Sequence, residues 1–180
     1  MRLLDSSAII TPFYSGQLNA LKVALNHHSP AETRKWLEEW LERGFASGRL
    51  VISSEVYTEV VERATPGKPG RELLKRLRES NNITVLQPTD ATWAELKEIH
   101  KFIEGRYEHH QAKVFLDKHD PLLVALAKTH RAVLVTEEQN RIPEVDASTG
   151  RIKGEPRLPF VAWAFEVRWV GLLQILGRSL

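Results

Sequence analysis

DKHDPLLVALAKTHRAVLVTEE, residues 117–138, is the stretch that decides the fold of this chain. Pro121 follows Asp120 directly, and proline suits the first helical position because its missing N–H costs nothing there. Apolar residues then recur at helical spacing, so a helix is predicted to begin at Asp120. Ala132–Val135 is a short apolar run typical of a strand buried on both faces. A helix followed by a buried strand is half of a βαβ unit, which predicts an α/β fold.

Acidic residues stand at the ends of these two elements. Asp120 opens the helix, while Glu137 and Glu138 follow the strand. Ligands of open α/β sheets bind outside the carboxyl ends of strands, which places the two glutamates favourably. The sequence leaves the distance from Asp120 to the glutamates open.

The first residues repeat the pattern of a strand that runs into acid. Leu3 and Leu4 predict a buried strand, and Asp5, Ser6 and Ser7 follow it. An acidic residue that closes the first strand, with hydroxyls beside it, is a typical start of an α/β metal site. Alone, the pattern is a weak signal.

Together these stretches resemble the PIN-domain family of metal-dependent nucleases, which includes the toxins of VapC type. The resemblance rests on LLDSSAII at the start, on ISSEVYTEV in the middle, and on DPLLVALA with LVTEE after it. It implies one three-layer α/β/α domain over residues 1–180, with a mainly parallel sheet of four or five strands.

The resemblance also implies a set of four acids, here called the acidic quartet. Its members are Asp5, Glu59, Asp120 and Glu138. The family usually has Asp or Asn where this chain has Glu138, and the choice between Glu137 and Glu138 stays open.

Other residues support the quartet in this reading. Ser7 and Thr136 are the neighbouring hydroxyls that orient carboxylates or water. Asp117 lies one turn before Asp120 and is either an auxiliary ligand or a helix cap, and Glu137 belongs to the same supporting group.

Spacing alone does not select Glu59. A helix is predicted over residues 55–64, and Glu55, Glu59 and Glu62 line one flank of it. Without the resemblance, a solvated helix edge is the preferred interpretation of all three. The resemblance favours Glu59.

Carboxylates in a cluster repel one another and are tolerated when they hold hard cations. Oxygen ligands of this kind suit Mg²⁺ or Mn²⁺, so a metal-dependent endoribonuclease is the leading hypothesis. Resemblance to the VapC-type toxins further implies an RNA substrate, a homodimer and an antitoxin protein that blocks the acidic pocket.

A long segment follows the quartet. Residues 139–158 are rich in Pro, Gly and charge, and they are predicted to form a loop insertion. Cations in it, together with the histidine before Asp120, are candidates for contacts with the substrate backbone. These are Arg141, Arg151, Lys153, Arg157 and His119. A surface insertion without a role is the alternative.

Composition bounds the remaining possibilities. The chain has 180 residues, no cysteine and a formal charge of +2. The length suits a single domain, and the missing cysteines exclude a disulfide framework and a zinc ribbon. No apolar run approaches the roughly 20 residues that span a bilayer, so a cytoplasmic protein without membrane contact is expected.

The sequence keeps one alternative to the nuclease and excludes another. A PIN-like module that binds RNA or protein with little catalysis is kept open by Glu138. A phosphatase of haloacid-dehalogenase type needs a second Asp two residues after the first, where this chain has Ser7.

A basic helix is predicted over residues 71–79. Its mixed charges fit a nucleic-acid contact surface and an ordinary solvated helix face about equally well.

Overall fold

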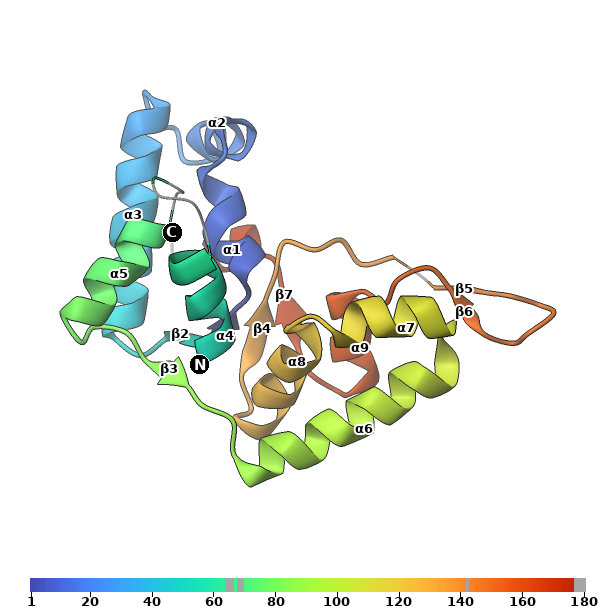
Figure 1. The fold of residues 1–180 in the computed structure, drawn as a ribbon. Helices are drawn as coiled ribbons and strands as arrows, with labels where there is room; N and C mark the ends of the chain where they lie inside the picture. The colour runs from blue at the N-terminus through green and yellow to red at the C-terminus, as the bar shows by residue number, and fades with distance from the viewer. Residues whose placement is uncertain (64–66, 68–69, 142, 177–180) are drawn as a thin grey trace. The chain divides into compact units, whose positions relative to one another are not determined.

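The computed structural model describes residues 1–63, 67, 70–141 and 143–176. The chain divides into two compact units, Met1–Leu86 (unit 1) and Gln87–Leu180 (unit 2). Figure 1 shows their elements coloured along the chain. One domain over residues 1–180 stays a prediction.

Unit 1 is built on three parallel strands with helices between them. Strand β2 lies between β1 and β3, with Leu3 opposite Val51 and Ile52 opposite Val85. The elements are β1 (Arg2–Leu4), α1 (Ser6–Ile10), η1 (Thr11–Phe13), α2 (Ser15–Ala24), α3 (Pro30–Ala46), β2 (Leu50–Ser53), α4 (Ser54–Tyr57), η2 (Thr58–Arg63), α5 (Arg71–Glu79) and β3 (Val85–Leu86).

Local sequence explains where the helices of unit 1 begin. Ser29 caps α3, because its side chain accepts a hydrogen bond from the N–H of Glu32, and Pro30 occupies the first helical turn. Ser53 caps α4 in the same way through the N–H of Val56.

The helix predicted over residues 55–64 differs from the structure. Regular α-helix covers only Ser54–Tyr57, and Thr58–Arg63 continue as a π-helical turn. Ala64, the last residue of the predicted helix, lies outside the described residues. Because a π turn widens the helix, it alters which side chains share a face, and such turns are frequent at functional sites.

Unit 2 places helices around a second parallel strand pair. Strands β4 and β7 pair with Leu134 opposite Trp169, and α6 packs along α8 (Figure 1). The elements are α6 (Asp90–Arg106), α7 (His109–Leu116), α8 (Asp120–Thr129), β4 (Val133–Val135), β5 (Glu144–Val145), β6 (Ile152–Lys153), α9 (Leu158–Ala164), β7 (Trp169–Val170) and α10 (Leu172–Leu176).

Residues 120–135 form the helix and the buried strand that the sequence predicts. Helix α8 begins at Asp120 with Pro121 in its first turn, and β4 follows with Leu134 and Val135 fully buried. Residues 139–158 hold more structure than the predicted loop. They contain β5 and β6, which form a short antiparallel hairpin, and Ile152 also bridges to Tyr107.

The predicted α/β class is confirmed. Five strands pair in parallel within the units, three in unit 1 and two in unit 2, and helices flank them. Across the described part of the chain, no helix is both long and apolar enough to cross a membrane.

Candidate functional site

Asp5 is a buried carboxylate between β1 and α1. Its Oδ1 accepts a hydrogen bond from the N–H of Ser6 at 2.7 Å, and its Oδ2 accepts one from the Ser7 hydroxyl at 2.6 Å. The strand ends at Leu4 and the helix begins at Ser6, so Asp5 is also the helix cap. Both oxygens are therefore fixed in direction by neighbours in the sequence.

Ser6 connects Asp5 to Glu59. The Ser6 hydroxyl donates to Oε1 of Glu59 at 3.1 Å, although the two residues are 53 positions apart. Glu59 lies in the π-helical turn η2, which brings its side chain to the N-terminus of α1. Within unit 1 the structure thus joins two members of the acidic quartet through one hydroxyl.

The other glutamates of this helical flank behave differently from Glu59. Oε1 of Glu55 accepts a hydrogen bond from the Ser54 hydroxyl at 3.0 Å, and its Oε2 is buried with no hydrogen-bond partner among the described residues. Glu62 is exposed. Glu59 is the one of the three that Ser6 contacts.

In unit 2, Asp120 and Glu138 act on a common cation, Lys118. Lys118 forms an ion pair with Glu155, and this hydrogen bond raises the pKa of the ammonium above its ordinary value. Desolvation opposes the shift, while the charges of Glu155, Asp120 and Glu138 reinforce it. The two predicted acids of unit 2 therefore lie within electrostatic range of the same ammonium group.

Glu137 and Glu138 separate after β4 and contact different helices. Oε1 of Glu137 accepts from the N–H of Leu172 at 2.6 Å, at the start of α10. Oε2 of Glu138 accepts from the N–H of Leu158 at 3.1 Å, at the start of α9. Carboxylates suit these positions because the first N–H groups of a helix have no partner within the helix.

Thr136 supports this arrangement from a buried position directly after β4. Its hydroxyl oxygen accepts a hydrogen bond from the N–H of Glu138 at 3.1 Å, which fixes the backbone between strand and acid. Asp117 is exposed and ends α7 as its C-cap, and His119 precedes α8 without a side-chain cap bond.

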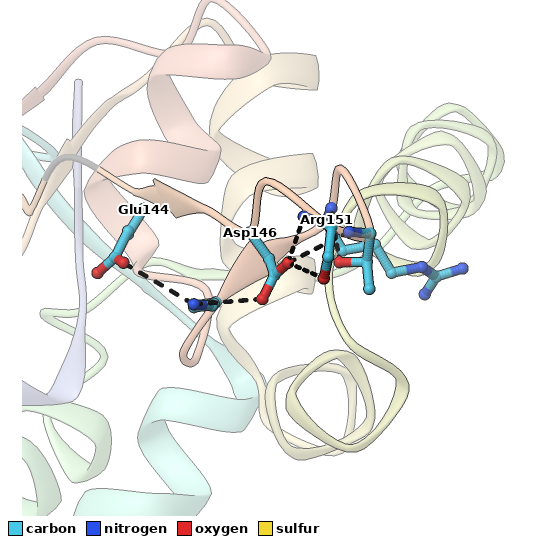
Figure 2. A network of polar contacts seen from close by, with 6 residues as sticks. Glu144, Asp146 and Arg151 are labelled. Atoms are coloured by element: carbon cyan, nitrogen blue, oxygen red, sulfur yellow. Dashed lines mark hydrogen bonds and ion pairs between the residues drawn. The ribbon is translucent and has the colours of Figure 1, made fainter.

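The four predicted substrate cations of residues 139–158 fall into two groups. Arg151 donates to the backbone oxygen of Tyr107 at 2.7 Å and so anchors the hairpin, and Lys153 pairs with Asp146 at 3.2 Å within it. Figure 2 shows Glu144, Asp146 and Arg151 in the polar network of this hairpin. Arg141 and Arg157 instead line a pocket of about 280 Å³ in unit 2.

The donor chemistry of the quartet suits a hard cation, since all four members supply carboxylate oxygens. Within the described residues, no three His, Cys, Asp or Glu side chains form a group that could hold a metal ion. Asp5 and Glu59 belong to unit 1 and Asp120 and Glu138 to unit 2. The quartet as a metal site therefore stays a prediction.

Two polar residues in these contacts carried no role in the sequence analysis. Ser6 stands beside the predicted Ser7, and its role follows from its contact with Glu59. Lys118 lies inside the opening stretch, and its position two residues before Asp120 was the one available signal. Both roles depend on partners far away in the sequence.

Comparisons with known proteins add the following. The family model described as Domain of unknown function (DUF4411) matches residues 14–179, a range that contains Glu59, Asp120 and Glu138 but not Asp5. A search of curated proteins finds no significant match.

Two solved structures resemble this chain over most of its length. The structure of VapBC-1 from nontypeable Haemophilus influenzae is 14% identical, with 96% of this chain and 98% of that chain covered and a TM-score of 0.49. FitAcB from Neisseria gonorrhoeae is 17% identical, with 96% and 99% covered and a TM-score of 0.47. Likenesses this weak carry no weight for the activity of this chain.

Proposed function

This chain belongs to the family described as Domain of unknown function (DUF4411), and we propose that it is a PIN-like, metal-dependent endoribonuclease that hydrolyses RNA phosphodiester bonds. The observation that carries the proposal is the Ser6 bridge. It connects a buried carboxylate, Asp5, with a second carboxylate that is distant in sequence, Glu59. Bringing two like charges together has an electrostatic cost, which a hard cation between them offsets.

In this proposal Asp5, Glu59, Asp120 and Glu138 hold Mg²⁺ or Mn²⁺. When bound, the metal polarises the scissile phosphate and activates a water for in-line attack. The protein keeps the carboxylates in fixed directions. The Ser6 N–H and the Ser7 hydroxyl orient Asp5, and Thr136 fixes the backbone of Glu138.

The contacts of unit 2 support Glu138 rather than Glu137 as the fourth acid. Glu138 acts on Lys118 together with Asp120, whereas Oε1 of Glu137 accepts a hydrogen bond from the N–H of Leu172 at the start of α10. Lys118 also provides a positive charge beside the two acids, which suits a phosphate that approaches them.

One observation favours the alternative function, a PIN-like module that binds RNA or protein with little catalysis. Glu138 already accepts a hydrogen bond from the backbone of Leu158, which is a structural role. If that role is its only one, the quartet is incomplete. The antitoxin partner and the homodimer stay predictions under either function.

The test is cleavage of a labelled RNA pool with Mg²⁺, with Mn²⁺ and with EDTA, by the wild type, Asp5→Asn and Asp120→Asn. Metal-dependent cutting that is lost in both variants supports the nuclease and its site. A folded protein that cuts with neither metal supports the binding module. Cutting that survives both substitutions contradicts the assignment of these acids.

A further inference from the structure

One pocket of unit 2 combines unpaired guanidinium groups with aromatic rings. Its lining includes Arg141, Arg157, Phe160 and Tyr107, and its volume is about 280 Å³. Over the described ranges, neither guanidinium has a carboxylate partner. A pocket this small suits a single building block of a polymer rather than a large ligand.

The acids that line the same pocket are each matched by a cation. Glu155 forms an ion pair with Lys118, and Glu144 lies 4.0 Å from Lys153. The charges of Arg141 and Arg157 therefore remain in excess, and an anion is the ligand that this balance favours.

Phe160 presents an aromatic surface beside these cations. It is half-buried on α9, and its ring centroid lies 5.8 Å from that of Trp163 at an interplanar angle of 35°. Trp163 is 69% exposed, so the pair forms an accessible aromatic surface. Cations with adjacent aromatic side chains are the combination that binds single-stranded nucleic acid, through phosphates and stacked bases.

The pocket adjoins the two predicted acids of unit 2. Arg157 directly precedes Leu158, whose N–H donates to Oε2 of Glu138 at 3.1 Å. On another side, Glu155 lines the pocket and pairs with Lys118, two residues before Asp120. A strand held in the pocket would therefore continue toward Asp120 and Glu138.

We propose that this pocket binds one nucleotide of a single-stranded RNA, with a phosphate on Arg141 and Arg157 and the base against Phe160. The inference rests on the proposed nuclease function, for which it supplies the substrate class and one subsite. A duplex is excluded from this mode because its bases are stacked on one another and cannot reach the ring.

The experiment measures binding by fluorescence anisotropy, with the full chain in EDTA and a short labelled single-stranded RNA. Arg141→Gln and Arg157→Gln are each expected to lower the slope of log affinity against log salt by about 0.7. The matched control is Arg131→Gln, because Arg131 is an exposed arginine of the same unit that follows the end of α8 opposite Asp120 and does not line this pocket. It is expected to leave the slope unchanged.

A second probe separates stacking from charge. Phe160→Ala is expected to weaken binding of the RNA about tenfold, whereas Phe160→Trp retains it, because loss of one base–aromatic stack has that magnitude. An abasic oligonucleotide with the same phosphates is expected to respond to Arg157→Gln but not to Phe160→Ala.

Three results would overturn the inference. The first is a salt slope in both arginine variants that equals the slope of Arg131→Gln. The second is a Phe160→Ala variant that binds the RNA and the abasic probe with equally reduced affinity. The third is duplex RNA that binds as tightly as the single strand. RNA that is bound in the proposed way but left uncut with Mg²⁺ and Mn²⁺ contradicts only the nuclease. Cutting with unchanged KM in both arginine variants contradicts only the subsite.

Discussion

At the residue scale, Ser6 links two acids that are 54 residues apart in the sequence, Asp5 and Glu59. Its hydroxyl donates to Oε1 of Glu59 at 3.1 Å, and its N–H donates to Oδ1 of the adjacent Asp5 at 2.7 Å. Ser6→Ala is expected to lower the free energy of unfolding by about 1 kcal/mol, because it removes a hydrogen bond to a carboxylate. Urea unfolding measures this change.

Ser80→Ala provides the control for Ser6→Ala. In the wild type, the Ser80 hydroxyl donates to the backbone oxygen of Arg76 at the exposed end of α5. Removal of this hydroxyl therefore exposes no buried acid. A smaller change is expected there. Equal losses of unfolding free energy in the two variants would mean that the Ser6–Glu59 hydrogen bond stabilises the protein no more than an exposed serine does.

Tyr107 gives a prediction in alkaline solution. Burial raises the pKa of its phenol to about 12, and the nearby charge of Arg106 only partly opposes this. A phenol whose pKa is raised on folding stabilises the protein fully below about pH 10, and this stability is lost as the pH rises toward about 12. Tyr107→Phe cannot ionise, so it should lose less stability in this range.

The measurement compares urea unfolding at about pH 8 and about pH 11. The wild type is expected to lose about 1 kcal/mol more than Tyr107→Phe between these conditions. Each protein is compared with itself at the lower pH, which removes any difference in packing. Equal losses in the two proteins would show that the phenol ionises as readily in the folded state as in the unfolded one.

The sequence was informative about single residues where a local pattern sets the role. Asp120 with Pro121 predicted the start of α8, and the structure begins the helix there. The contact of Glu138 with Leu158, twenty residues later, could not be predicted. Periodicity reports which face of an element is apolar, but it does not report which distant backbone group a polar side chain reaches.

At the scale of elements, two glycines with similar backbone angles have different surroundings. Gly48 ends α3 with φ +68°, and an added Cβ would meet no atom within 4 Å. Gly70 begins α5 with φ +82°, and a Cβ there would lie 2.8 Å from Cγ2 of Ile9. A side chain at either position would strain the left-handed backbone, whereas only a side chain at Gly70 would also clash with Ile9.

Gly48→Ala is expected to lower the free energy of unfolding by about 1 kcal/mol through backbone strain. Gly70→Ala is expected to lower it by about 1 to 3 kcal/mol more, because Ile9 must shift within the core. Urea unfolding of the pair isolates the steric part. Equal losses would mean that Ile9 accommodates the methyl group without cost.

The β5–β6 hairpin depends on Asp146. The hydroxyl and N–H of Ser148 hold the pKa of this carboxyl well below its usual range, with Lys153 and the N–H of Thr149 contributing (Figure 2). A lowered pKa stabilises the hairpin above the unfolded value of about 3.9, and this support is lost as the pH falls.

Hydrogen exchange tests the role of Asp146 directly. The N–H of Gly150 donates to the Asp146 backbone at 2.8 Å, so its protection factor reports closure of the turn. The protection factor of Gly150 is expected to fall in Asp146→Asn, because the variant keeps an acceptor oxygen but loses the charge. In the wild type it is expected to fall as the solution is acidified toward pH 3.9 and below. Protection unchanged in Asp146→Asn would contradict the electrostatic account.

The sequence predicted regular elements better than irregular ones. The basic helix over residues 71–79 matches α5 in full, because its apolar spacing is regular. The π-helical turn η2 and the β5–β6 hairpin were missed. A π turn requires only one extra residue in the helical register, and a strand of two residues is too short for alternation to be visible.

At the scale of the whole molecule, the two halves of the quartet lie in different units of the chain. In each half, a carboxylate close to a strand end accepts hydrogen bonds from N–H or hydroxyl groups: Asp5 in unit 1 and Glu138 in unit 2. The resemblance to the PIN family supplied the identity of the four acids, since no spacing rule connects Asp5 to Glu138. Double variants therefore test whether the four acids act together, because no sequence pattern reports this.

Asp5→Asn and Asp120→Asn together test whether the quartet acts as one set. If both acids hold the same metal, either substitution alone is expected to lower kcat/KM by at least about 100-fold, and the double variant should lose little more, because the first change already disables the set. Asp90→Asn, an exposed acid at the start of α6, is the control and is expected to keep the wild-type rate. Losses that multiply in the double variant would mean that the two acids contribute independently, and the proposal of a single metal site would fail while the requirement for each acid remained.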